Sequence, residues 1–171
     1  MGMLDRYQKT GGFVQLVSLL ETCGQVKQEK FLEIIRNENS VWAEAIKAKL
    51  LSIEKIYSWN DDTLAEIFGT LQDLTVAVAL YAGNDEFKTR IYGFLSHGRR
   101  RKVEDLLGTS NPTPTEIATM HMKIVESVRK MAVEGSIRFD RFDPSMFIDD
   151  AIEDKLNRSA AGVEHSSHST P

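Results

Sequence analysis

The sequence predicts an all-α protein, an armadillo-like helical repeat unit followed by a small helical bundle. Three observations support this fold class. Apolar residues recur at intervals of three and four, as on one face of an α-helix. Glycine, proline and capping residues divide the pattern into segments mostly near the average helix length of about 11 residues or shorter. No stretch alternates strictly between apolar and polar residues, as a half-buried strand would.

Three helices are predicted in the repeat unit. Gly11 and Gly12 precede the first, and its apolar face carries Phe13, Leu16, Val17 and Leu20. The second is expected over 26–36, after Gly24. Ser40 is the expected N-cap of a third helix over 41–56, with Trp42, Ile46, Leu50, Ile53 and Ile56 on one face.

The predicted bundle begins with Asn60-Asp61-Asp62, a capping residue followed by acidic residues that a helix N-terminus favours. Asp73 is the expected cap of a short apolar helix that ends at Gly83. Thr113 and Glu116 fit a capping box with Pro114 at the first helical position, and Gly135 is the expected stop. Other bundle helices are expected over 64–71, 86–95 and 99–107.

These patterns divide the chain into five predicted segments. They are an N-terminal segment (1–10), the armadillo-like unit (11–50), the C-terminal helical bundle (51–140), a short helix (141–158) and a disordered tail (159–171). The tail is rich in serine and histidine and nearly lacks large apolar residues, so it offers little surface to bury.

Composition restricts the function classes. The chain has 171 residues and a net charge of -4, which argues weakly against a nucleic-acid or membrane-surface role. Its apolar runs are far shorter than the ~18 residues that a bilayer span requires, and no signal pattern opens the chain. We therefore expect a cytoplasmic protein without membrane insertion. Its single cysteine, Cys23, cannot form an internal disulfide and is expected to be a small buried residue.

No motif for catalysis is present. The sequence has no phosphate-binding glycine loop, no paired-cysteine zinc spacing and no nucleophile motif, so we expect no enzyme activity, cofactor or metal. His165 and His168 could bind a stray metal ion, but a solvated tail is favoured. His121 lies near the apolar stripe of its helix, where a packed side chain is the default.

One charge run stands out: Arg99, Arg100, Arg101 and Lys102, followed by Glu104 and Asp105. A cationic run could bind phosphates or an acidic protein face. The alternative is a solvated helix start, with the two acids offsetting the unfavourable interaction between cations and the helix dipole.

The order of these segments resembles the C-terminal region of the flagellar motor switch protein FliG. The resemblance rests on Gly11-Gly12, Ala43 to Ile46, Ala79 to Gly83 and Glu134 to Ile137. It covers the second armadillo-like unit and the terminal bundle of that family, in a divergent form that lacks the N-terminal domain. Leu50, Leu51, Ser52 and Ile53 stand where the family carries an aromatic-rich hinge.

The resemblance implies a non-enzymatic rotor or switch-complex component at the cytoplasmic face of the membrane in the flagellar basal body. Its implied partners are the switch-ring proteins and the stator's cytoplasmic loop, with self-association as a further expectation. In the family, a charged ridge faces the stator. Here the ridge lysine falls on Tyr81 and the paired acids on Glu104 and Asp105, so the expected partner-binding set is Arg99 to Lys102 with these three residues.

The main alternative is a helical adaptor outside the flagellum, such as a cytoplasmic regulatory module resembling that of magnesium transporters. Such a module would use clustered carboxylates. The better candidate cluster here is Asp149-Asp150 with Glu153-Asp154, for which an exposed acidic helix is the simpler interpretation. Nucleic-acid binding ranks third, because no aromatic residue interrupts the basic run.

Overall fold

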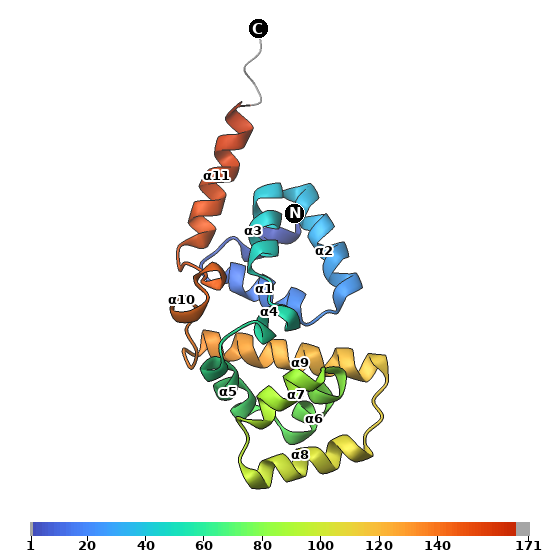
Figure 1. The fold of residues 1–171 in the computed structure, drawn as a ribbon. Helices are drawn as coiled ribbons and strands as arrows, with labels where there is room; N and C mark the ends of the chain where they lie inside the picture. The colour runs from blue at the N-terminus through green and yellow to red at the C-terminus, as the bar shows by residue number, and fades with distance from the viewer. Residues whose placement is uncertain (1, 167–171) are drawn as a thin grey trace. The chain divides into compact units, whose positions relative to one another are not determined.

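The structure, a computed structural model, describes residues 2–166. The described part is built from α-helices and two short 3-10 helices and contains no strand, which confirms the all-α prediction (Figure 1). None of its helices is both long and apolar enough to span a membrane. The chain forms two compact units: a first unit of residues 1–50 with 143–171, and a second unit of residues 51–142.

The first unit packs its helices around one apolar core. Its elements are η1 (Met3–Tyr7), α1 (Gly12–Glu21), α2 (Gln25–Glu38), α3 (Ser40–Lys49), η2 (Pro144–Met146) and α11 (Ile152–Ser166). Phe13 and Trp42 lie at the centre, fully buried, with their ring centroids 5.8 Å apart. The local backbone requires glycine at both positions of the pair before α1. Gly11 has a positive φ of 85°, and a Cβ on Gly12 would lie 2.0 Å from the Tyr7 carbonyl oxygen.

The last helix of the chain belongs to this first unit. Ile152 and Leu156 of α11 pack against its core. The buried Glu153 accepts a hydrogen bond from the Phe13 backbone N–H at 3.1 Å, and Asn157 accepts one from Trp42 Nε1, also at 3.1 Å. The prediction of a separate short helix over 141–158 was therefore wrong. The predicted disordered tail was wrong as far as Ser166, where α11 ends, and residues 167–171 lie outside the described residues.

The helix predicted over 41–56 is broken in the structure. α3 ends at Lys49, and α4 (Ile53–Tyr57) starts after Ser52, whose Oγ accepts a hydrogen bond from the Lys55 N–H. A serine N-cap therefore overrides an apolar spacing that continues through the break. The N-cap of α3 is Asn39 and not Ser40, because Asn39 Oδ1 accepts from the N–H groups of the first turn. The hinge assigned to Leu50, Leu51, Ser52 and Ile53 stays a prediction.

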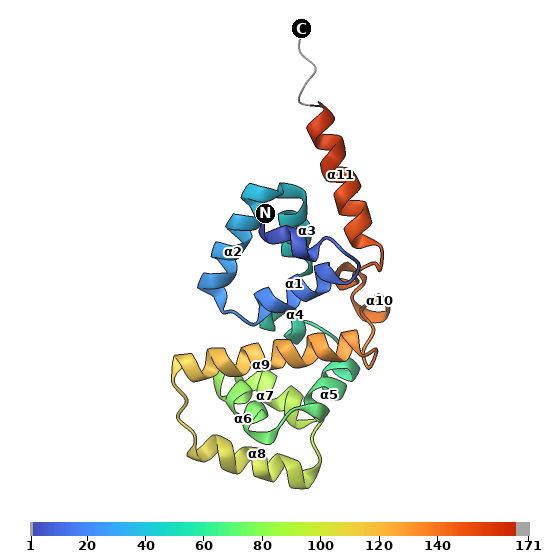
Figure 2. The same ribbon diagram turned by 180° about the vertical axis from the view of Figure 1, so that it is seen from behind.

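The second unit surrounds one nearly apolar helix, α6 (Asp73–Ala82). Its residues from Thr75 to Leu80 are all buried, as expected for a helix that is apolar on every side. α6 contacts α8 (His97–Thr109) and α9 (Pro114–Val133), which lie on different sides of it (Figures 1 and 2). The remaining elements are α5 (Asp61–Thr70), α7 (Asp85–Tyr92) and α10 (Phe139–Phe142).

Local capping sets most helix boundaries in the second unit. Thr113 and Glu116 form the predicted capping box, and Gly135 adopts the positive φ of 80° expected at a stop. Asp73 was wrongly predicted as a cap. It is the first residue of α6, and its carboxylate binds an arginine from α8 instead.

Candidate interaction surface

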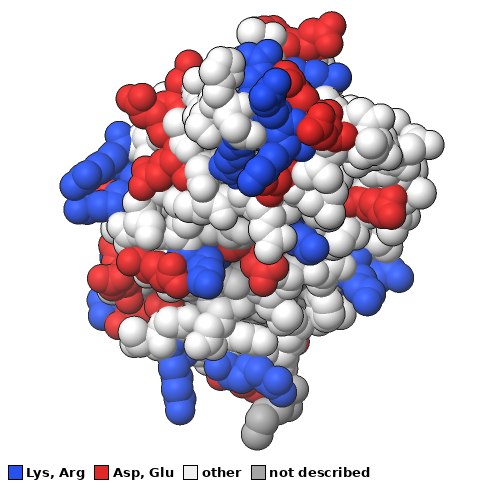
Figure 3. Space-filling model, turned by 90° about the horizontal axis from the view of Figure 1, so that it is seen from below, with Lys and Arg blue, Asp and Glu red and all other residues white. Residues whose placement is uncertain are grey.

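α8 carries the predicted charge run and is attached to the unit by its other face. Val103 is fully buried, whereas Arg100, Arg101, Lys102, Glu104 and Asp105 are all exposed. Figure 3 looks at the protein from below the view of Figure 1, onto the side where α8 lies. A group of basic side chains lies near the top of this view, with acidic side chains directly beside it (Figure 3).

Arg99 does not belong to this exposed set. Its Nε donates to Asp73 Oδ1 at 2.8 Å, its Nη1 to the Phe68 carbonyl at 2.7 Å, and its Nη2 to the Leu71 carbonyl. The two carbonyls end α5, and the carboxylate begins α6. The side chain is 21% exposed. The planar guanidinium thus joins α8 to the α5–α6 junction, and its place in the predicted partner-binding set is corrected to an internal role.

Arg90 makes the same arrangement one junction earlier. Its Nε donates to Asp61 Oδ1 at 2.5 Å, and its two Nη groups donate to the carbonyls of Tyr57 and Trp59 at 3.0 and 2.6 Å. These groups end α4 and begin α5. We call Arg90 and Arg99 the arginine clamps. Each donates to carbonyl groups at or next to a helix C-terminus, where the last carbonyls lack some of their intrahelical partners, and together they tie α7 and α8 to successive helix junctions.

The exposed residues of α8 are held only by weak local contacts. Arg100 Nε lies 2.9 Å from Glu104 Oε1, and its guanidinium lies 4.7 Å from the centroid of the Tyr92 ring. Both partners of the ion pair are more than 40% exposed, so it contributes about 0–1 kcal/mol. Within residues 2–166, Arg101 and Lys102 form no ion pair. Their charges are therefore available to a partner.

Tyr81 lies on a different helix from this charge run. It is 40% exposed at the end of α6, and its hydroxyl donates to Asn111 Oδ1 at 3.1 Å in the loop before α9. The side chain is thus tied to that loop rather than to α8. The exposed Leu74, one residue after the start of α6, adds apolar surface to the same helix.

The residues considered for metal binding do not form a metal site in the described part of the chain, where no group of three His, Cys, Asp or Glu side chains comes together. Asp149 instead binds Lys155 at 2.6 Å, and Glu153 is buried, so the acidic helix is not wholly exposed as predicted. His168 lies outside the described residues. Cys23 is half-buried rather than fully buried, and burial raises the pKa of its thiol.

His121 packs beside Tyr57, with the two rings edge to face and their centroids 6.4 Å apart. Burial lowers the pKa of His121 below 6.5, although the nearby Glu54 carboxylate opposes this shift. The imidazole is therefore neutral at neutral pH.

We expect acid to destabilise the fold through His121. A folded-state pKa below the unfolded value means that the unfolded chain binds the proton more readily. Stability should fall as the pH drops below 6.5 and stop changing, for this group, below the lowered pKa. Urea midpoints measured at several pH values for the parent and His121→Phe check this. If the variant loses stability over this pH window as steeply as the parent, His121 is not the responsible group.

The arginine clamps were missed at the sequence level. Their partners lie 26 to 33 residues away along the chain, beyond the range of any helical pattern. One signal pointed to Arg99. A basic residue in the first turn of α8 opposes the helix dipole, and Arg99 offsets that cost through its contacts with Asp73 and two carbonyls.

Known proteins resemble most of the chain. The model of the FliG C-terminal domain family matches residues 33–139. The flagellar motor switch protein FliG of Aquifex aeolicus is 27% identical over 133 residues, 75% of this chain and 40% of the relative. The FliG protein of Thermotoga maritima is 21% identical over 138 residues, 80% of this chain and 41% of that protein. The chain thus spans about two fifths of the length of these curated relatives.

Two solved FliG structures are also similar to this chain. Residues 116–343 of FliG from H. pylori align with a TM-score of 0.50 and 19% identity, covering 76% of this chain and 58% of that one. This likeness supports a shared fold. Full-length FliG from Aquifex aeolicus aligns with a TM-score of 0.47 and 25% identity, over 74% of this chain and 40% of that chain.

Proposed function

Because the chain belongs to the FliG C-terminal domain family, we propose that it is a non-enzymatic component of a flagellar switch complex that works through protein–protein contacts. The matched relatives are named flagellar motor switch proteins. The proposed location is the cytoplasmic face of the membrane in the basal body. The proposed partners are the switch-ring proteins and the stator's cytoplasmic loop, together with self-association.

The exposed charge run on α8 is the observation that carries this proposal. Arg101 and Lys102 project beside Glu104 and Asp105 on a helix that is fixed by Val103 and Arg99. Exposed charges on a rigid helix change protein stability little but set the orientation and rate of association. A partner helix of alternating charge would complement this surface. Tyr81, as a further partner-binding residue, and the hinge over 50–53 also remain parts of the proposal.

Charge reversal on α8 is the direct experiment. We expect Arg100→Glu, Arg101→Glu and Lys102→Glu together to weaken binding to the stator's cytoplasmic loop by at least about tenfold at low salt, because a favourable charge pairing becomes repulsive. Arg99 is left unchanged, since its loss would disturb the fold. Binding of the purified chain to the stator loop, and separately to the ring protein adjacent to FliG, is measured by calorimetry.

The matched control reverses three exposed lysines in the first unit: Lys27, Lys30 and Lys47. It changes the net charge by the same amount, so equal losses in both variants would mean a general charge effect and contradict a role for α8. If the parent chain binds neither partner, the flagellar proposal fails. The shared fold would then reflect common ancestry alone, and the helical adaptor outside the flagellum would become the leading hypothesis.

A further inference from the structure

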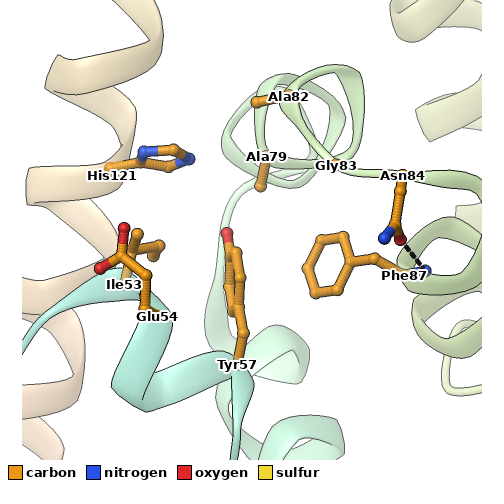
Figure 4. A pocket seen from close by; sticks show the side chains of 9 residues that line it. All are labelled: Ile53, Glu54, Tyr57, Ala79, Ala82, Gly83, Asn84, Phe87 and His121. Atoms are coloured by element: carbon orange, nitrogen blue, oxygen red, sulfur yellow. Dashed lines mark hydrogen bonds between the residues drawn. The ribbon is translucent and has the colours of Figure 1, made fainter.

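A surface pocket in the second unit has no role in the proposed function. It holds about 360 Å³ and lies between α4, the end of α6, the start of α7 and α9 (Figure 4). This volume is at the lower end of the range for small-ligand sites. Glu54, Ala82 and Asn84 are exposed at its rim, so the pocket opens onto the surface.

Three polar side chains converge on one side of this pocket. Figure 4 shows the Glu54 carboxylate, the His121 ring and the Tyr57 hydroxyl around the same space. The Tyr57 hydroxyl oxygen is buried and has no hydrogen-bond partner within residues 2–166. His121 is neutral at neutral pH, as argued above. Glu54 therefore supplies the formal charge among the nine residues that line the pocket.

The rest of the lining is aromatic and apolar. The Tyr57 and Phe87 rings pack with centroids 4.3 Å apart, and Ala79 and Ile53 add aliphatic surface. The Glu54 carboxylate forms no ion pair or hydrogen bond with another residue within residues 2–166, whereas its backbone carbonyl accepts from the Ser58 N–H. A carboxylate beside aromatic rings attracts a cation, and the aliphatic surface suits an apolar stem.

We propose that this pocket binds the side chain of a lysine or arginine presented by a partner protein. The cationic head lies at Glu54, with the Tyr57 oxygen and the neutral His121 ring as further acceptors. The methylene stem lies against Ile53, Ala79 and Phe87. A side chain fits better than a free amine, because one charged contact in an open pocket holds a small molecule weakly, whereas a partner adds contacts around the rim.

Chemical-shift titration of the full chain tests the proposal without any flagellar protein. The probes are N-acetyl-lysine methylamide, n-butylammonium and n-butanol. We expect both cations to shift the Tyr57 and His121 signals in a saturable way, and n-butanol not to. Glu54→Gln should weaken binding of the cations at least about tenfold, as expected for loss of a contact to a charged group. Glu66→Gln, which removes an exposed carboxylate from α5, should leave binding unchanged.

Each other outcome contradicts the proposal. Equal binding to Glu54→Gln and the parent would mean that the carboxylate does not recognise the cation. Saturable binding of n-butanol would indicate a merely apolar pocket. Binding of n-butylammonium but not of the blocked lysine would assign the site to a small amine rather than to a partner's side chain.

Discussion

Replacing Arg99 with methionine should lower the free energy of unfolding by about 2–4 kcal/mol. The side chain makes three hydrogen bonds, and a bond to a charged group is worth about 1.5–3 kcal/mol. The expected loss is smaller than their sum, because the Phe68 carbonyl keeps the hydrogen bond from the Leu71 N–H and the Asp73 carboxylate is partly exposed to water. Urea unfolding followed by circular dichroism measures the change, and amide hydrogen exchange shows whether the first turn of α8 loosens.

Two variants separate the clamp from a simple effect of charge. Arg99→Lys keeps the charge but loses the planar fork, so it should recover only part of the stability. Arg101→Met removes an exposed charge from the same helix and should change stability by no more than about 0.5 kcal/mol. Equal effects of Arg99→Met and Arg101→Met would show that the contacts of Arg99 contribute nothing.

The Arg99 clamp should also affect how strongly the chain binds a partner. If Arg99 positions α8, its loss should weaken stator-loop binding even though Arg100, Arg101 and Lys102 remain. Reversal of those three residues should weaken binding without loosening α8. The two effects therefore have different signatures in hydrogen exchange.

Features specified by neighbouring residues were predictable. The capping box from Thr113 to Glu116, the stop at Gly135 and the apolar α6 all follow from residues within one helix or its ends. The break before α4 was not predicted. Leu50, Ile53 and Ile56 continue the apolar spacing of α3 across it, and periodicity alone does not show where a serine cap takes over.

Features specified by distant residues were not predictable. Arg99 looked like one member of a surface run until its partners on α5 and α6 were in place. Glu153 looked like one acid of an exposed helix. Its burial depends on the N-terminus of α1, 140 residues earlier, which no local pattern connects to it.

Replacing Glu153 with alanine should destabilise the first unit by about 2–4 kcal/mol. α1 has no side-chain cap of its own, because its N-cap is Gly11. The Phe13 N–H is one of the first-turn donors that a helix leaves unpaired, and Glu153 accepts it from α11 at a site 3% exposed. Alanine would leave this buried donor unsatisfied and open a cavity, and both effects are unfavourable.

Neighbouring substitutions make this result specific. Glu153→Gln keeps the volume and an oxygen acceptor, so it should cost less than Glu153→Ala; any remaining loss measures the attraction between the carboxylate and the α1 dipole. Asp154→Ala removes the next acid, which is exposed, and should change stability by no more than about 0.5 kcal/mol. Thermal and urea unfolding of the full chain compare the three variants. If Glu153→Ala is no more destabilising than Asp154→Ala, α11 is not held on the first unit by this carboxylate. Its apolar contacts through Ile152 and Leu156 would then have to account for its position.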